Sequence, residues 1–253
     1  MAGKLKNKVG PLSLVALLRD VRQVEKDSKP LAVAGARELV PVLARELRAG
    51  GDPDAVVEQD HDGAAALIWV GEADEARLRA ANRAKIPIVA VTDAPTMPYV
   101  LADDLVRIPP GQGFPVDLIA AAVARRLDDD GISLAARLPA LRSAVTDRLI
   151  AAASRRNGLI GVAVFVPGVD MPILTFNQLR MVLRIAVAHG QGIDRARALE
   201  LIGVVGAGFT FRAIARSLLD FVPVGGWAVK GAIAYTGTRA LGEAAARYFG
   251  ALR

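Results

Sequence analysis

The residues best placed for phosphate chemistry follow the first apolar run of the chain, Leu31–Gly35. A nucleotide phosphate loop at such a place needs Gly, four residues, and then Gly-Lys-Ser or Gly-Lys-Thr, so that backbone amides, the lysine charge and a magnesium-bound hydroxyl hold the phosphates. Counting from Gly35, the last three of these positions, 40–42, are Val, Pro and Val. Glu38 also brings negative charge to the start of the following helix, where it repels an anion. The sequence therefore predicts no phosphate binding by a standard loop.

Two further places have the spacing of nucleotide-binding motifs without their residues. The tetrapeptide Asp-His-Asp-Gly at 60–63 matches Asp-x-x-Gly, and we interpret it as a polar turn before a strand. Asp93 stands where guanine-nucleotide-binding proteins have Asn-Lys-x-Asp, yet the three residues before it are Ala, Val and Thr. We therefore predict that Asp93 is a turn or capping residue before Pro95.

No set of residues indicates a catalytic or metal centre. The chain has no Cys and only two His, which removes thiolate catalysis and Cys-based zinc sites and disfavours a His-rich site. His189 precedes Gly190, a pairing typical of a helix C-terminus, where a cation suits the dipole. The glycine-rich stretch 203–208 follows a helix and not a strand, unlike a dinucleotide-binding loop. We predict no catalytic residue, no cofactor and no metal.

Positive charge concentrates in the most apolar part of the chain. From Arg155 onward, 12 Arg and Lys stand against 5 Asp and Glu, a net charge of +7, whereas the residues before it carry −1. This combination indicates an anionic membrane surface or an acidic protein as partner. Aromatic residues make up only 5%, which argues against nucleic acid. Two arginine pairs are either a solvated face or contacts with such a partner: Arg180 with Arg184, and Arg212 with Arg216.

The first half of the chain alternates apolar runs with amphipathic stretches. Continuous apolar runs are typical of buried parallel strands, and helices between them indicate a doubly wound parallel sheet. The expected strands are Leu31–Gly35, Ala64–Val70, Ile86–Val91 and a segment within Tyr99–Ile108. The expected helices are Arg37–Arg48, with Leu39, Val42, Leu43 and Leu47 on one side, Glu72–Lys85 and Val116–Leu127.

No strand pattern follows Gly131, so an all-α part is expected after the α/β part. Ile132–Asn157 has the pattern of one long amphipathic helix, either straight or kinked. The expected apolar helices beyond it are Gly158–Val166, Pro172–His189, Asp194–Val205, Phe209–Phe221 and Trp227–Phe249. The sequence thus predicts a basic N-terminal segment with a helix (Leu12–Val24) at 1–29, an α/β domain at 30–130, a connecting helix at 131–157 and an apolar helical domain at 158–253.

The helical domain contains two long apolar runs, Gly158–Leu179 and Phe221–Thr238. A membrane-spanning helix needs about 20 apolar residues, but prolines and charged residues, among them Asp170 and Lys230, interrupt both runs. A charge at the centre of a spanning helix costs about 3 kcal/mol. These helices are therefore expected either to pack on themselves or to be embedded in, or lie on, a bilayer, and the cost of the charges favours the interfacial arrangement over a spanning one.

Small residues recur at every fourth position of the last expected helix. Such a ridge lets another helix approach closely, in water or in lipid. It predicts either tight packing inside one subunit or a face for self-association. Its members are Ala228, Ala232, Thr236, Ala240 and Ala244.

Two separated motifs of the helical domain resemble the domain of unknown function 697 family. The first reads Val-Pro-Gly-Val-Asp-Met-Pro-Ile-Leu-Thr at 166–175, with Asn-Gln-Leu-Arg-Met at 177–181. The second reads Pro-Val-Gly-Gly-Trp-Ala-Val-Lys at 223–230, with Ala-Tyr-Thr-Gly-Thr-Arg-Ala-Leu-Gly at 234–242. In that family the domain commonly follows an Era-like GTPase domain and is often membrane-associated. The resemblance implies a degenerate GTPase-like domain at 30–130 and carries no catalytic residue with it.

These patterns together predict a non-enzymatic, membrane-associated scaffold or regulator. Its pseudo-GTPase domain would bind a protein, and its helical domain would anchor the chain or form oligomers. Because the basic N-terminus is not followed by a signal-peptide pattern, we expect the cytoplasmic side of a membrane. One alternative is a nucleotide-binding switch with a non-standard phosphate loop, around Gly35 or at Gly111-Gln112-Gly113. Another is a soluble, cytoplasmic protein-interaction module whose apolar helices form its core.

Overall fold

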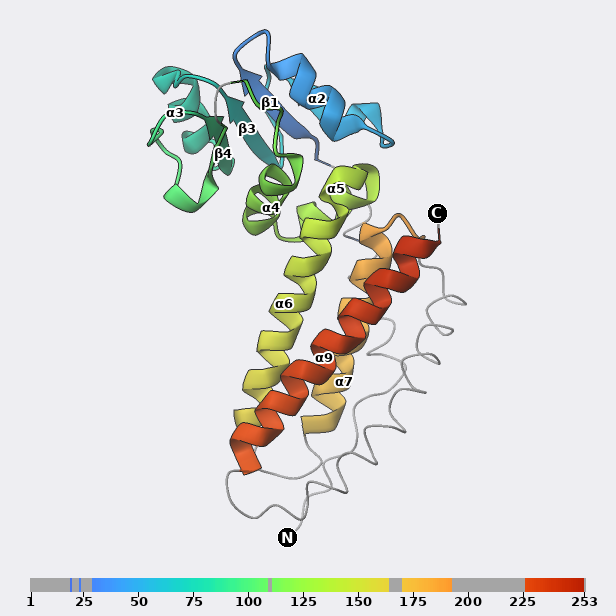
Figure 1. The fold of residues 1–253 in the computed structure, drawn as a ribbon. Helices are drawn as coiled ribbons and strands as arrows, with labels where there is room; N and C mark the ends of the chain where they lie inside the picture. The colour runs from blue at the N-terminus through green and yellow to red at the C-terminus, as the bar shows by residue number, and fades with distance from the viewer. Residues whose placement is uncertain are drawn as a thin grey trace. The chain divides into compact units, whose positions relative to one another are not determined.

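The computed structural model describes residues 29–108, 111–163, 170–192 and 226–252, together with positions 19 and 23 (Figure 1). The chain divides into two compact units. The α/β unit holds residues 24–148 with 188–191, and the helical unit holds 149–187 with 192–253 and 1–23. The division falls inside one continuous helix, α6 (Pro139–Ala163).

The α/β unit contains a parallel sheet with the strand order β2-β1-β3-β4-β5. This confirms the predicted class, and the order is that of flavodoxin-like doubly wound sheets. One strand, β2, lies outside the expected set, because three residues are too few to stand out as an apolar run. The strands are β1 (Leu31–Gly35), β2 (Val56–Glu58), β3 (Ala66–Val70), β4 (Ile88–Thr92) and β5 (Leu105–Arg107).

Helices cover both faces of the sheet (Figure 1). All residues of β3 and β4 are buried, as strands with continuous apolar runs require. On one face, Leu78 of α3 (Glu75–Arg83) belongs to a core cluster with Trp69. The other face is covered by α2 (Val40–Arg48) and α4 (Val116–Arg126). Two short 3₁₀ turns, Pro53–Ala55 and Ala102–Asp104, precede β2 and β5.

The predicted apolar side of α2 is wrong at two positions. The helix buries Val40, Leu43 and Leu47, whereas Leu39 and Val42 are exposed. Leu39 is the N-cap residue and so lies before the first helical turn. Val42 points to solvent because successive helical residues are rotated by about 100°, which turns it away from the face that carries Leu43.

The long helix predicted from Ile132 is two helices. α5 spans Asp129–Arg137, and α6 begins at Pro139 and continues to Ala163, past the predicted end. Leu138 between them is extended, with φ −119° and ψ 101°. A residue before proline avoids helical angles, whereas proline itself suits the first turn of a helix, so the break lies at Leu138.

The described part of the helical unit consists of the second half of α6, α7 (Asp170–Ala188) and α9 (Gly226–Ala251), which lie side by side (Figure 1). α7 ends at Ala188, one residue before the predicted end, and Gly190 with φ +76° follows as expected after a helix C-terminus. Within the described ranges, no helix has the length and apolarity to cross a membrane. The helices expected at Asp194–Val205 and Phe209–Phe221 lie outside the described residues, as does that at Leu12–Val24 apart from positions 19 and 23.

Candidate functional site

Doubly wound sheets bind ligands in the crevice outside the carboxyl ends of the strands where the strand order reverses, here between β1 and β3. In this protein the two strand ends are held directly together. The Ala36 N–H donates to the Val70 carbonyl oxygen at 2.9 Å. A Cβ on Gly35 would lie 2.1 Å from the same oxygen, and the φ of Gly35 is +123°. Glycine at the end of β1 therefore serves close strand packing.

The connection from β1 to α2 is also short, since only residues 36–39 join them. The N–H groups of Leu39 and Val40 both donate to the Ala36 carbonyl oxygen, at 3.1 and 3.0 Å. A standard phosphate loop has about eight residues from its first Gly to its Ser or Thr. Counted from Gly35, this length ends at Val42 inside α2, so the spacing is present, but positions 40–42 lack the Gly, Lys and hydroxyl that would hold a phosphate.

One arginine near this edge is engaged by protein groups. Arg77 of α3 donates to the side-chain Oε1 of Gln59 at 3.1 Å and to its carbonyl oxygen at 2.6 Å. Its guanidinium carbon also lies 5.0 Å from the centroid of the Trp69 ring. Gln59 has φ +63°, an uncommon conformation outside glycine, and the two hydrogen bonds from Arg77 hold it there. No local sequence motif joins these residues.

The two other motif-like places are turns. The Asp62 N–H donates to Oδ1 of Asp60 at 3.1 Å, and Gly63 has φ +71°, which confirms the predicted polar turn. After β4, Oγ1 of Thr92 accepts the Ala94 N–H at 3.2 Å, so Thr92 supplies the side-chain hydrogen bond of the turn that contains Asp93.

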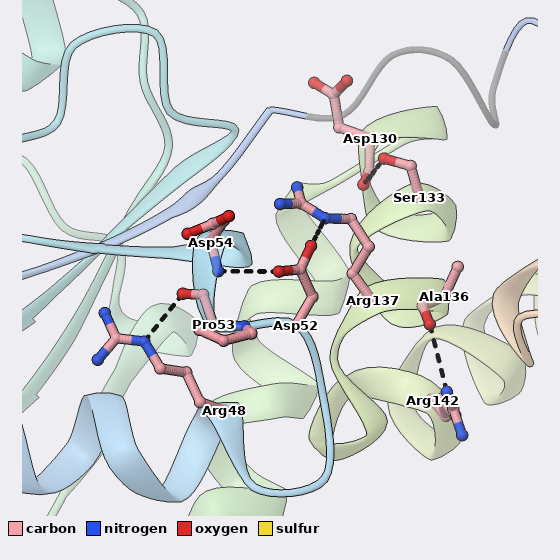
Figure 2. Close-up of polar contacts among 9 residues, drawn as sticks. All are labelled: Arg48, Asp52, Pro53, Asp54, Asp130, Ser133, Ala136, Arg137 and Arg142. Carbon is pink, nitrogen blue, oxygen red and sulfur yellow. Dashed lines mark hydrogen bonds and ion pairs between the residues drawn. The ribbon is translucent and has the colours of Figure 1, made fainter.

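Polar contacts fasten the α2–β2 loop to α5, as Figure 2 shows. Nε of Arg137 donates to Oδ2 of Asp52 at 2.8 Å, and the Asp52 N–H donates back to the Arg137 carbonyl oxygen at 2.9 Å. The Arg137 hydrogen bond, with help from the Asp54 N–H, holds the pKa of Asp52 below its ordinary value. A Cβ on Gly51 would lie 2.4 Å from the Arg137 carbonyl oxygen. These contacts hold the loop against α5, and the Asp52 carboxylate is already bonded to Arg137 and to the Asp54 N–H.

The helical unit contains a buried layer of amide and hydroxyl side chains where its three helices meet. Nδ2 of Asn157 and Nε2 of Gln178 each donate to Oγ1 of Thr238 at 2.9 Å. Nδ2 of Asn177 donates to Oδ1 of Asn157 at 2.9 Å. Ser154, one turn before Asn157, is fully buried, and its Oγ has no hydrogen-bond partner in the described part of the chain. The layer fixes how α6, α7 and α9 align.

Glycines allow α6 and α9 to approach closely beside this polar layer. A Cβ on Gly161 would lie 3.0 Å from the Lys230 carbonyl oxygen, and a Cβ on Gly231 would lie 3.0 Å from the Gly158 carbonyl oxygen. The ridge singled out in the sequence lies on another side of α9. Its members Ala232, Thr236, Ala240 and Ala244 are exposed, and the side chain of Ala228 lies outside the described set. Self-association through this ridge stays a prediction.

The four arginines singled out for partner contact divide into two groups. Arg180 and Arg184 on α7 are half-buried. Arg212 and Arg216 lie outside the described residues. Contact of these side chains with lipid or an acidic protein stays a prediction.

The described residues contain no group of three or more His, Asp or Glu side chains placed to hold a metal ion. Comparison of the chain with protein-family models, with curated proteins and with solved structures finds no match. Function must therefore be argued from the geometry of the two units themselves.

Proposed function

We propose that this protein is a non-enzymatic scaffold or regulator that associates with the cytoplasmic face of a membrane. Its α/β unit acts as a degenerate GTPase-like domain that binds a partner protein. Its helical unit, which resembles the domain of unknown function 697, anchors the chain or joins copies of it. The observation that carries this proposal is that the backbone amides of Ala36, Leu39 and Val40, which follow the end of β1, are bonded to protein carbonyl oxygens, at the place where sheets of this strand order hold a ligand.

Three features of the junction support a role without nucleotide. The Ala36 N–H at the end of β1 is bonded to the Val70 carbonyl oxygen, so this amide is already paired. Positions 40–42, where such a loop has Gly, Lys and Ser or Thr, are Val, Pro and Val. The nearby cation of Arg77 is bonded to Gln59 and stacked on Trp69, so its use by a phosphate would require breaking those contacts. Phosphate loops instead present free amides and a lysine.

Nucleotide binding is the first test. We expect titration calorimetry with GTP or ATP and magnesium to show no binding, and thermal unfolding to be unchanged at millimolar nucleotide. A ligand that binds the folded state raises its stability in proportion to the logarithm of its concentration over Kd. Micromolar affinity with turnover would overturn the proposal. Binding without turnover would support the switch with a non-standard loop near Gly35 or Gly111.

Fractionation of cells that express the full-length protein is the second test. We expect the protein in the membrane pellet, and release by salt if the contact is electrostatic and interfacial. Retention through a carbonate wash would mean that helices insert. Recovery in the soluble fraction from the outset would remove the membrane association and leave a soluble interaction module.

A further inference from the structure

One end of the helical unit exposes large apolar side chains from all three of its described helices. Leu159, near the end of α6, is 71% exposed, and Ile173, near the start of α7, is 46% exposed. Val229 and Ile233, in the first turns of α9, are 37% and 39% exposed. Water-exposed apolar side chains are ordinary when scattered, but a group from three helices at one end indicates a contact surface.

Contacts inside the unit place these side chains at the same end. Nδ2 of Asn157 lies 3.4 Å from the Leu174 carbonyl oxygen, which joins the end of α6 to the start of α7. A Cβ on Gly161 would lie 3.1 Å from the Cβ of Ala234, which joins the end of α6 to the start of α9. Each exposed apolar residue is therefore within about two helical turns of these contacts. We call this group, with the cations described next, the apolar tip.

The exposed charged side chains that the structure describes at the apolar tip are positive, whereas the side chain of Asp170, at the start of α7, lies outside the described set. Arg155 and Arg156 on α6 and Lys230 on α9 are exposed. The described stretches around them, 149–163, 173–187 and 229–242, contain no Asp or Glu. Long basic side chains beside apolar ones are the composition that binds the interface of an anionic bilayer, because the cations meet headgroup phosphates while the apolar groups enter the acyl boundary.

The interior of the unit has the opposite character. Asn157, Gln178 and Thr238 are buried and bonded to one another, and α6 packs on α9 through glycines. Small residues at close helix contacts, with amide and hydroxyl side chains bonded across helices, are the packing used by helices in lipid. Because hydrogen bonds and close glycine contacts hold its helices together, such a unit keeps its internal contacts when its exposed apolar side chains move from water into a lipid interface.

We infer that the apolar tip is the surface through which the protein binds membranes, and that its ligand is the anionic phospholipid headgroup layer. Leu159, Ile173, Val229 and Ile233 enter the headgroup region, and Arg155, Arg156 and Lys230 bind the phosphates around them. The inference rests on the proposed membrane association and adds its location and lipid class.

Sedimentation of the full-length protein with vesicles tests the lipid class and the cations. We expect binding to phosphatidylcholine vesicles that contain phosphatidylglycerol, little binding to phosphatidylcholine alone, and weaker binding as salt rises. Arg155→Glu with Arg156→Glu should lower the affinity by roughly tenfold or more. The matched control is Arg83→Glu with Arg247→Glu, which changes the net charge equally at exposed positions that are not part of the tip. Equal losses in both double variants would overturn the inference.

A cysteine probe tests the position of the tip directly, because the chain has no native Cys. An environment-sensitive fluorophore on Leu159→Cys should shift to the blue with anionic vesicles. The same label on Tyr248→Cys, an exposed position near the other end of α9, should not. If the protein sediments with vesicles but the two labels respond alike, membrane association stands and the tip is wrong. If it sediments with no vesicle and fractionates as soluble, the membrane part of the proposed function fails with it.

Discussion

Nε of Arg137 and Oδ2 of Asp52 lie 2.8 Å apart although 85 positions separate the two residues in the chain. This pair joins the last turn of α5 to the loop between α2 and β2, and the backbone of Asp52 bonds Arg137 as well. The first helix after the α/β core is thereby fixed to the loop that leads into β2, and α5 is part of the α/β unit.

The Asp52 pair makes stability depend on acid pH. The pKa of Asp52 is lowered in the folded protein by Arg137, so the unfolded chain takes up a proton first as the pH falls. The stabilisation is complete above the ordinary carboxyl pKa of about 3.9 and is lost as the pH falls through the lower folded value. Asp52→Asn should therefore lower the melting temperature at neutral pH, and the gap from wild type should narrow as the pH falls below the ordinary carboxyl pKa of about 3.9.

Thermal melts of Asp52→Asn and Asp54→Asn across this range are the measurement. Asp54 contributes its backbone N–H to Asp52, so its side-chain amide variant should keep the wild-type slope. A gap between Asp52→Asn and wild type that stays constant with pH would contradict the assigned role of the carboxylate.

Gly35→Ala should destabilise the α/β unit strongly. Its Cβ would meet the Val70 carbonyl oxygen at 2.1 Å, and its φ of +123° suits glycine alone. Backbone strain and overpacking together should cost about 2–5 kcal/mol. Gly63→Ala is the control, because Gly63 also has positive φ but nothing lies within 4 Å of its Cβ position; it should cost about 1 kcal/mol. Urea unfolding measures both, and equal losses would mean that the β1–β3 junction is not tightly closed.

Thr238→Val should destabilise the helical unit, although it conserves volume. The substitution removes the acceptor of two buried amide donors, from Asn157 and Gln178, at a cost of about 2–4 kcal/mol. Thr236→Val, two residues along the same helix, changes an exposed side chain and should stay within about 0.5 kcal/mol of wild type. Denaturant unfolding followed by helical circular dichroism compares them, and similar stabilities would show that the layer contributes little.

The sequence was most informative where one strong local pattern decides the structure. The strand Leu31–Gly35 was predicted with its observed ends. A strand that is buried on both faces is a continuous apolar run, and such a run can be identified from the sequence without knowing which strands pair with it. The break at Leu138 could have been read from Pro139, but helical periodicity on both sides concealed it. The exposed position of Val42 depends on which face of α2 meets the sheet, which the apolar residues alone left ambiguous.

Contacts between residues that are far apart in the chain could not be predicted from the sequence. Arg77 meets Gln59 and Trp69 only because the sheet order brings the ends of β2 and β3 near the start of α3. In the helical unit, isolated polar residues such as Asn157 and Thr238 inside apolar helices were an available signal, since a buried amide needs a partner. Their pairing with each other required the helix arrangement.

Ser154→Ala should leave stability unchanged or raise it, the opposite sign from its neighbour Asn157. The Ser154 hydroxyl is fully buried, and its Oγ is unpaired within the described residues, so removing it relieves a desolvation cost. Alanine also favours helix over serine by about 0.5 kcal/mol, so a gain of about 0.5–1 kcal/mol is expected. Asn157→Ala should instead lose about 2–3 kcal/mol, because Asn177 then lacks its acceptor and Thr238 loses a donor. Urea titration of the two single variants distinguishes these signs. A loss above about 1 kcal/mol in Ser154→Ala would show that the hydroxyl is bonded in solution, to a buried water for example.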